Sequence, residues 1–181
     1  MPREEVVERL LTVFRDRGYD GASLAELSAA TGLGKSSLYH YFPGGKEEMA
    51  SAVLAHLNDW LKVHALDPLR QPGAPARRIQ RMVEALDECY AGGKNACVLG
   101  NMVVGGGRQI FQRELRKSFG AWIDALAKVL ADAGQPPKQA RERAEDAVIR
   151  IEGALILAGG LGEPTPFRRL LKRLPHDLLA D

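Results

Sequence analysis

The chain has 181 residues, of which 45% are hydrophobic and 27% charged, and its formal net charge is +2. This balance is typical of a soluble globular protein, and the length suits one ordinary domain or two small ones that share a core. No apolar run approaches the roughly 20 residues of a membrane span, and the charged segment MPREEVVERL does not have the pattern of a signal peptide. Cys89 and Cys97 are therefore expected to be reduced thiols in a cytoplasmic protein.

The first two predicted elements are helices. Residues 3–17 carry an apolar stripe at spacings of three and four, and Gly18 ends the pattern. Ser23 and Glu26 form a capping box that starts a second, short helix. Gly32 suits the end of that helix, where φ becomes positive.

A third short helix is predicted over residues 35–40, with Leu38 and Phe42 pointing inward. Two short helices joined by a tight turn that contains glycine make a helix-turn-helix, whose second helix enters the major groove of DNA. The outward side chains of this helix are then candidates for reading base edges. The alternative is an ordinary solvated helix face.

The remainder of the chain is also predicted to be helical. Helices are expected over 46–64, 76–90, 96–104, 108–133, 137–160 and 166–174, with loops at 67–75 and 91–95 and a break at 105–107. No segment alternates with period two for long enough to form a strand. The sequence therefore predicts an all-α protein of about nine helices.

The helix over 137–160 indicates a partner subunit. From residue 147 to residue 161 it is apolar almost all round, and such a helix must be buried on every side. The final helix is expected to pack beside it, so that two helices from each of two subunits form a four-helix bundle. The residues predicted for this dimer interface are Val148, Ile151, Leu155, Ala158, Phe167, Leu170, Leu171 and Leu174. Glu152 is expected at the rim of the interface, or paired with a cationic group.

Several residue types at fixed offsets carry a family resemblance. The first helix ends in Gly-Tyr, a Ser-Leu-x-x-Leu helix and an Ala-Thr-Gly-Leu turn follow, and Lys-Ser-Ser-Leu-Tyr-His-Tyr-Phe leads to Lys46-Glu47. Together they resemble the DNA-binding domain of the TetR/AcrR family of transcriptional regulators. NACVLGN, over 95–101, resembles a Gly-Cys-x-x-Gly-Asn motif of one subgroup, with Ala96 where glycine is frequent.

The resemblance implies a homodimeric repressor that binds a palindromic operator and responds to a small molecule. It implies a DNA-binding domain over residues 1–48 and an effector-binding and dimerisation domain over residues 49–181. Residues 35–40 would be the recognition helix, Lys46 would contact phosphate, and Tyr39 and Tyr41 would flank the groove. The expected DNA-binding residues are Ser23, Thr31, Gly34, Lys35, Ser36, Ser37, Tyr39, His40, Tyr41 and Lys46.

An apolar effector pocket is expected between helices of the second domain. Its candidate residues are Trp60, Met82, Leu86, Tyr90, Met102, Phe111, Phe119 and Trp122. Each of them also fits an ordinary core position, and the expectation of a pocket follows mainly from the resemblance.

The charge of the N-terminal region bears on how it would bind DNA. Residues 1–49 hold six basic and eight acidic residues, so a shallow salt dependence of DNA binding is expected. The acidic balance also leaves open an adaptor that acts without an effector.

The sequence shows no pattern typical of an enzyme or of a metal site. No nucleophile–base pair or phosphate loop points to an enzyme, no cofactor is implied, and His56 and His64 lie too far apart to share a metal. A redox role for the two cysteines is an alternative to simple burial.

Overall fold

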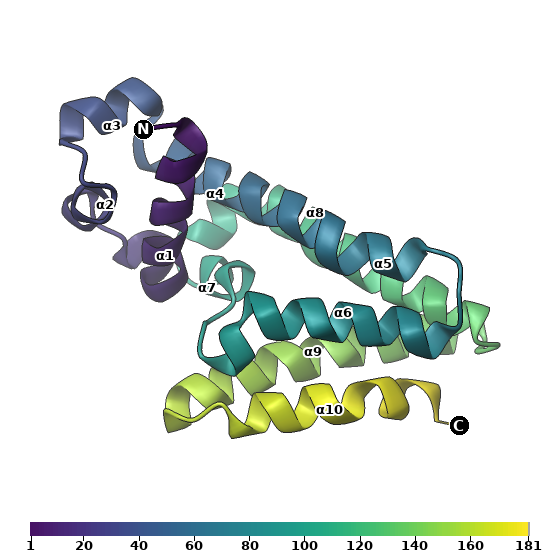
Figure 1. The fold of residues 1–181 in the computed structure, drawn as a ribbon. Helices are drawn as coiled ribbons and strands as arrows, with labels where there is room; N and C mark the ends of the chain where they lie inside the picture. The colour runs from purple at the N-terminus through teal and green to yellow at the C-terminus, as the bar shows by residue number, and fades with distance from the viewer. Residues whose placement is uncertain (181) are drawn as a thin grey trace. The chain divides into compact units, whose positions relative to one another are not determined.

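The computed structural model describes residues 1–180 and shows an all-helical chain (Figure 1). Its elements are α1 (Arg3–Gly21), α2 (Leu24–Thr31), α3 (Lys35–Tyr41), α4 (Gly45–Leu61), a π-helical turn (Lys62–Leu66), α5 (Asp67–Arg70), α6 (Pro75–Cys89), a 3₁₀ turn (Ala91–Gly93), α7 (Val98–Val103), α8 (Gly107–Asp132), α9 (Pro137–Leu161) and α10 (Thr165–Leu179). The predicted all-α class is confirmed. Within residues 1–180, every helix is too short or too polar to cross a lipid bilayer.

Three elements differ from the sequence-based expectation. Helix α1, expected to end at Gly18, has a kink there, where φ is +64°, and continues to Gly21. The segment at 67–75, predicted as a loop, begins with the single turn of α5, where Pro68 occupies one of the first helical positions and needs no hydrogen-bond acceptor. The last helix continues to Leu179 rather than ending near residue 174, although Pro175 lies inside it. The buried side chain of Leu178 extends the apolar stripe of α10, so packing outweighs the single backbone hydrogen bond that Pro175 removes.

The residues group into two compact units. The N-terminal unit consists of residues 1–59 and 97–116, and the C-terminal unit of residues 60–96 and everything from 117 onward. Helices α4 and α8 each run from one unit into the other. The N-terminal unit thus includes α7 and the start of α8, which follow α3 by more than 50 residues in the chain.

The core of the N-terminal unit holds the helix-turn-helix in place. Phe14 of α1, Leu27 of α2, Leu38 of α3 and Met49 of α4 are all completely buried. Arg9 adds a polar tie, because its guanidinium donates to the carbonyl of Thr31 at 3.1 Å. The predicted inward positions Leu38 and Phe42 are confirmed.

Hydrogen bonds connect the C-terminal part of α1 to the segment around α7, an arrangement that the sequence did not predict. The side-chain amide of Asn101 donates to the carbonyl of Arg15, and the backbone N–H of Gly106 donates to the Asp20 carboxylate at 2.7 Å. A Cβ on Gly105, which has φ +72°, would collide with the same carboxylate. The glycine run at 105–107 therefore does more than break a helix, because it lets the backbone close around Asp20.

In the C-terminal unit, α10 lies beside α9 and also contacts α6 (Figure 1). The Tyr90 and Phe167 rings meet edge to face, with centroids 5.7 Å apart. Trp122 of α8 donates its indole N–H to the sulfur of Met82 at 3.4 Å. Large side chains from α6, α8 and α10, together with Tyr90 just after α6, thus contribute to the core of this unit.

Candidate nucleic-acid interface

The start of α2 is built by the predicted capping box. The backbone N–H of Glu26 donates to Ser23 Oγ at 3.2 Å, and the backbone N–H of Ser23 donates to the Glu26 carboxylate at 3.0 Å. The hydrogen bond from the Ser23 backbone N–H is the largest cause that lowers the pKa of Glu26, and the hydrogen bond that the Ser23 hydroxyl donates to the same carboxylate at 2.8 Å is the second. Gly32 ends the helix with φ +71°, as the sequence predicted. Ser23 is exposed, so its capping role does not remove it from the candidate interface.

Thr31 has a structural role. Its side chain is completely buried, and its hydroxyl donates to the carbonyl of Leu27 at 2.8 Å. The same oxygen accepts the backbone N–H of Leu33 at 3.3 Å. The prediction that Thr31 contacts DNA is therefore corrected: its hydroxyl joins α2 to the turn and does not reach the surface.

We expect Thr31→Val to lower the free energy of unfolding by about 1–2 kcal/mol, because the Leu33 N–H loses its acceptor while the side-chain shape is kept. Chemical denaturation should show this loss. The folded variant should bind DNA with unchanged affinity, in contrast to variants of the exposed α3 residues. A selective loss of DNA affinity without loss of stability would contradict this assignment.

Helix α3 presents one continuous polar face. Lys35, Ser36, Ser37, Tyr39 and His40 are all exposed, whereas Leu38 between them is completely buried. Gly34 precedes the helix in an extended conformation and is also exposed. A helix of seven residues anchored by one leucine thus offers nearly its whole outer surface to a partner.

The two tyrosines of α3 differ in their surroundings. Tyr39 is 45% exposed, and its ring packs close to Gly45, where a Cβ would lie 3.3 Å from the ring. Tyr41 is half-buried, and its hydroxyl donates to the carbonyl of Met1 at 2.6 Å. Tyr39 therefore faces outward, while Tyr41 joins the recognition region to the start of the chain.

Lys46, predicted to contact phosphate, makes two contacts within the N-terminal unit. Its ammonium donates to the carbonyl of Ala22 at 2.9 Å and lies 4.6 Å from the centre of the Tyr19 ring. It thereby connects the start of α4 to the segment between α1 and α2. A contact between Lys46 and phosphate stays a prediction.

Several acidic residues of the N-terminal unit are engaged by partners outside α3. Glu5 pairs with Arg9, Glu26 with Arg17, and Glu48 with Arg3, while Asp20 accepts the Gly106 N–H. No acidic residue occurs within α3 itself. The negative balance over residues 1–49 therefore describes α1, α2 and α4 rather than the surface that α3 presents.

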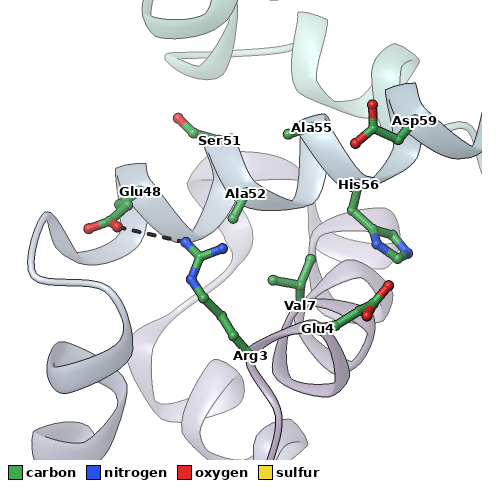
Figure 2. A pocket seen from close by; sticks show the side chains of 9 residues that line it. All are labelled: Arg3, Glu4, Val7, Glu48, Ser51, Ala52, Ala55, His56 and Asp59. Atoms are coloured by element: carbon green, nitrogen blue, oxygen red, sulfur yellow. Dashed lines mark ion pairs between the residues drawn. The ribbon is translucent and has the colours of Figure 1, made fainter.

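A hollow of about 460 Å³ lies between α1 and α4, and most of its charged lining residues are acidic (Figure 2). Arg3 reaches across it to Glu48 at 3.8 Å, and its guanidinium also lies 4.7 Å from the centre of the Phe42 ring. Glu4 and Asp59 line the same hollow. Three carboxylates against one arginine make this surface unsuited to DNA phosphates, which leaves α3 as the candidate interface.

The predicted effector residues fall into both units. Met82, Leu86, Tyr90 and Trp122 are buried in the C-terminal unit, where Trp60 and Phe119 are half-buried. Met102 and Phe111 are buried in the N-terminal unit, and the Phe111 ring meets Tyr19 edge to face at 5.3 Å. The pairing of Trp122 with Met82 and of Phe111 with Tyr19 gives these side chains core contacts. An effector pocket among them stays a prediction.

The predicted dimer residues require a correction. Seven of them are buried inside the protomer, and Leu170 alone is partly exposed; the seven are Val148, Ile151, Leu155, Ala158, Phe167, Leu171 and Leu174. The opposite side of α9 exposes Ile149 by 66%, Ile156 by 76% and Leu161 by 57%. The helix is apolar on both sides, and the sequence alone did not show which side faces the protomer's own core.

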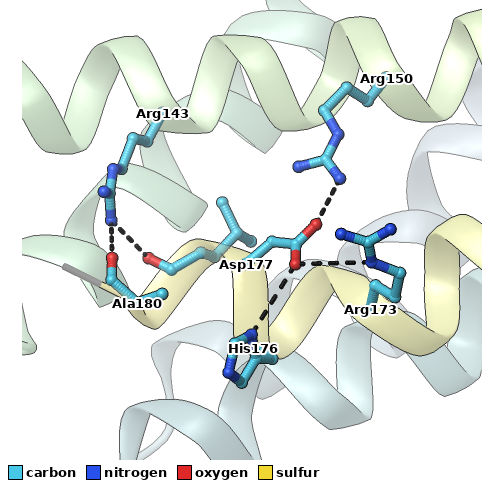
Figure 3. Close-up of polar contacts among 7 residues, drawn as sticks. Arg143, Arg150, Arg173, His176, Asp177 and Ala180 are labelled. Atoms are coloured by element: carbon cyan, nitrogen blue, oxygen red, sulfur yellow. Dashed lines mark hydrogen bonds and ion pairs between the residues drawn. The ribbon is translucent and has the colours of Figure 1, made fainter.

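Polar contacts also hold α10 against α9 (Figure 3). The Asp177 carboxylate of α10 accepts from Arg150 of α9 at 2.6 Å and lies 3.9 Å from Arg173. The hydrogen bond from Arg150 is the main reason that the pKa of Asp177 is lowered. Arg143 of α9 donates to the carbonyl of Ala180 at 2.6 Å. These contacts hold α10 in a fixed position against α9.

Comparisons with known proteins agree with this arrangement. Residues 7–53 match the family model of bacterial regulatory proteins of the tetR family, and residues 75–173 match the C-terminal domain of LmrA/YxaF-like transcriptional regulators. The HTH-type transcriptional regulator LmrA of Bacillus subtilis (strain 168) is 24% identical over 181 residues, which cover 98% of this chain and 96% of that protein.

Solved structures show the same fold. A TetR transcriptional regulator from Legionella pneumophila superposes with a TM-score of 0.82 and 21% identity, covering 96% of this chain and 93% of its own. A cysteine mutant of the TetR family regulator CifR, in a structure with 26-bp operator DNA, has a TM-score of 0.80 and 20% identity over 97% of this chain and 96% of its own. Because the C-terminal match alone spans more than half of the chain, the protein belongs to the TetR family of transcriptional regulators, with an LmrA/YxaF-like C-terminal domain.

Proposed function

We propose that this DNA-binding transcriptional regulator is a homodimeric repressor, released from a palindromic operator by a small, largely apolar effector. Family membership makes it a regulator rather than an enzyme. The observation that carries the proposal is the exposed polar face of α3, which is free of acidic residues and anchored from behind by Leu38. Its action on bacterial DNA would take place in the cytoplasm.

The chemistry of α3 suits direct reading of bases. Lysine donates to the O6 and N7 acceptors of guanine, and serine hydroxyls accept or donate to several bases. Lys35, Ser36, Ser37 and His40 are the proposed base-reading residues, and Tyr39 is proposed to lie beside the backbone. Because one such helix offers few contacts, two copies at the spacing of successive major grooves, about 34–36 Å, would supply the affinity.

The proposed partner surface is the exposed apolar face of α9. Ile149, Ile156, Leu157 and Leu161 are each at least half exposed in the protomer, and Gly153 and Gly160 on the same helix permit close approach of another backbone. A second copy of the chain is the natural cover for this face, since a two-fold axis lets the same apolar patch pack on itself.

The effector is proposed to act through the two helices that continue across both units. An effector changes operator binding only to the extent that its affinity differs between two states of the protein. Helices α4 and α8 have one end in each unit, so a change around them reaches the residues that fasten α1. The apolar effector chemistry is suggested by the aromatic and methionine side chains of the C-terminal unit.

Selection of bound duplexes from a random DNA pool tests the proposal. We expect a palindrome with two half-sites about one helical turn apart. Apolar small molecules are then screened for release of this DNA, with quenching of Trp60 or Trp122 fluorescence as an independent sign of binding. Recovery of sequences with no common motif, or of a single unpaired half-site, would contradict the proposed repressor.

The salt dependence of operator binding should be shallow. Because residues 1–49 hold only six basic residues against eight acidic ones, we expect a slope equivalent to about 2–4 phosphates per subunit on the counterion-release scale. Binding is measured from about 50 to 200 mM salt, the range over which that slope is resolved. A slope corresponding to about ten or more phosphates per subunit would contradict the expectation and would require basic residues outside α3.

A further inference from the structure

A basic hollow in the C-terminal unit is separate from the candidate DNA interface and from the proposed dimer face. It has a volume of about 420 Å³ and lies where the α5–α6 connection meets the far end of α8. Its lining residues are Arg70, Gln71, Pro72, Arg78, Lys128 and Asp132. Three of the six are cationic and one is acidic.

Arg78 is the buried part of this hollow. Its side chain is 9% exposed, so the guanidinium is held within the protein and is not a mobile surface group. Nε donates to the carbonyl of Leu69 at 2.7 Å, and Nη1 donates to Asp132 at 2.8 Å. A guanidinium has five N–H groups in a fixed plane, so three of them remain for another acceptor. Arg78 itself is one of the residues that line the hollow.

The side-chain acceptors that line the hollow are already engaged. One oxygen of Asp132 accepts from Arg78 and the other from Lys128. The side-chain carbonyl of Gln71 accepts from Arg81 at 3.1 Å, which leaves its NH₂ group as a donor. Arg70 pairs with Asp67 at 3.3 Å and is still half exposed. The walls therefore offer donors and positive charge, with one carboxylate already shared between two cations.

We propose that this hollow binds a phosphate-type anion carried by a small molecule. The three cations face two carboxylates, Asp132 and the Asp67 that pairs with Arg70, so one positive charge remains in excess for the phosphate group. The planar guanidinium of a fixed arginine suits bidentate contact with phosphate oxygens. The volume lies within the roughly 300–1,000 Å³ of small-molecule sites, which leaves room for more than one phosphate group.

This proposal does not depend on the proposed repressor function, because its readout is binding to the protein without DNA. Calorimetric titration of the full chain with pyrophosphate and with inorganic phosphate, at constant ionic strength set by sodium chloride, tests it directly. Pyrophosphate should bind more tightly than phosphate, since it fills more of the hollow. Citrate, a carboxylate probe of similar charge, should bind at least about tenfold more weakly than pyrophosphate.

Two double variants separate a built site from general charge. Arg70→Gln with Lys128→Gln removes two cations that are at least half exposed, so the fold is expected to persist. This variant should bind pyrophosphate at least about tenfold more weakly, because hydrogen bonds to charged groups are lost. Lys117→Gln with Lys172→Gln removes the same charge from exposed positions of the same unit and should leave binding unchanged.

Three outcomes would overturn the proposal. The first is a wild-type protein that shows no pyrophosphate binding above the chloride background. The second is an equal loss of binding in both double variants, which would indicate unspecific attraction to a basic protein. The third is citrate binding as tight as that of pyrophosphate, which would exclude phosphate as the preferred group. In each case Arg78 would have a structural role only, because its hydrogen bonds connect α6 to Leu69 and Asp132.

Discussion

Replacing Lys35 with alanine is expected to weaken operator binding by about 2–6 kcal/mol per dimer, or at least about 30-fold in Kd. This follows from the roughly 1–3 kcal/mol of a good contact to a base edge, counted once in each subunit. Lys35 is exposed at the first position of α3, and its side chain makes no hydrogen bond or ion pair within residues 1–180. Stability should not fall, because a cation at a helix N-terminus opposes the helix dipole.

The matched control is Lys138→Ala. Lys138 lies in the first turn of α9, is 90% exposed, and makes only a long ion pair with Glu142. Operator affinity measured by fluorescence anisotropy should fall for Lys35→Ala and stay unchanged for the control. If Lys35 reads guanine, its loss should also relax the preference at one position of each half-site. Equal affinity of Lys35→Ala and wild type would show that α3 is not the reading helix.

Replacing Ile156 with glutamate is expected to separate the subunits. Ile156 is 76% exposed in the protomer, so the change leaves the protomer's own core intact. In a symmetric dimer it would bury two carboxylates in apolar surroundings and weaken association by about 2–4 kcal/mol, or roughly 30- to 1,000-fold. Sedimentation equilibrium should show monomers at concentrations where the wild type is dimeric. Operator affinity should fall with it, because each half-site would bind one recognition helix alone.

The control for this change is Ile110→Glu, which introduces the same charge at a position that is 40% exposed in the N-terminal unit. It should remain dimeric. A contrasting variant, Leu155→Glu, alters the neighbouring residue on the buried side of α9 and should unfold the protomer rather than dissociate a dimer. If Ile156→Glu stays dimeric while folded, the partner surface lies elsewhere and the proposed face is wrong.

Local signals were enough to predict the helix-turn-helix. The Ser23–Glu26 capping box, the glycine at position 32 and the inward Leu38 each depend on residues within four positions of one another, and all three are found as predicted. Helix capping, backbone conformation and side-chain spacing are local properties, so the sequence contains the information directly. The family resemblance drew on the same short segment.

Contacts between residues far apart in the sequence could not be predicted from these local patterns. The hydrogen bonds from Gly106 to Asp20 and from Asn101 to Arg15 each join residues 86 positions apart. No spacing rule relates such positions, because the contact exists only once two helices are packed together. The contacts of Lys46 with Ala22 and Tyr19 were missed for the same reason, since only a contact with phosphate was expected of this lysine.

The sequence by itself determined the all-helical class, the helix-turn-helix and the excess of apolar residues on α9, since these follow from local propensity and periodicity. The tertiary structure decided which side of each element is used. It buried Thr31 under the turn, turned Ile151 and Leu155 toward the protomer's own core, and left Ile149 and Ile156 exposed. Periodicity shows that a face is apolar, but only packing against a particular neighbour decides whether that face becomes core or remains open to a partner.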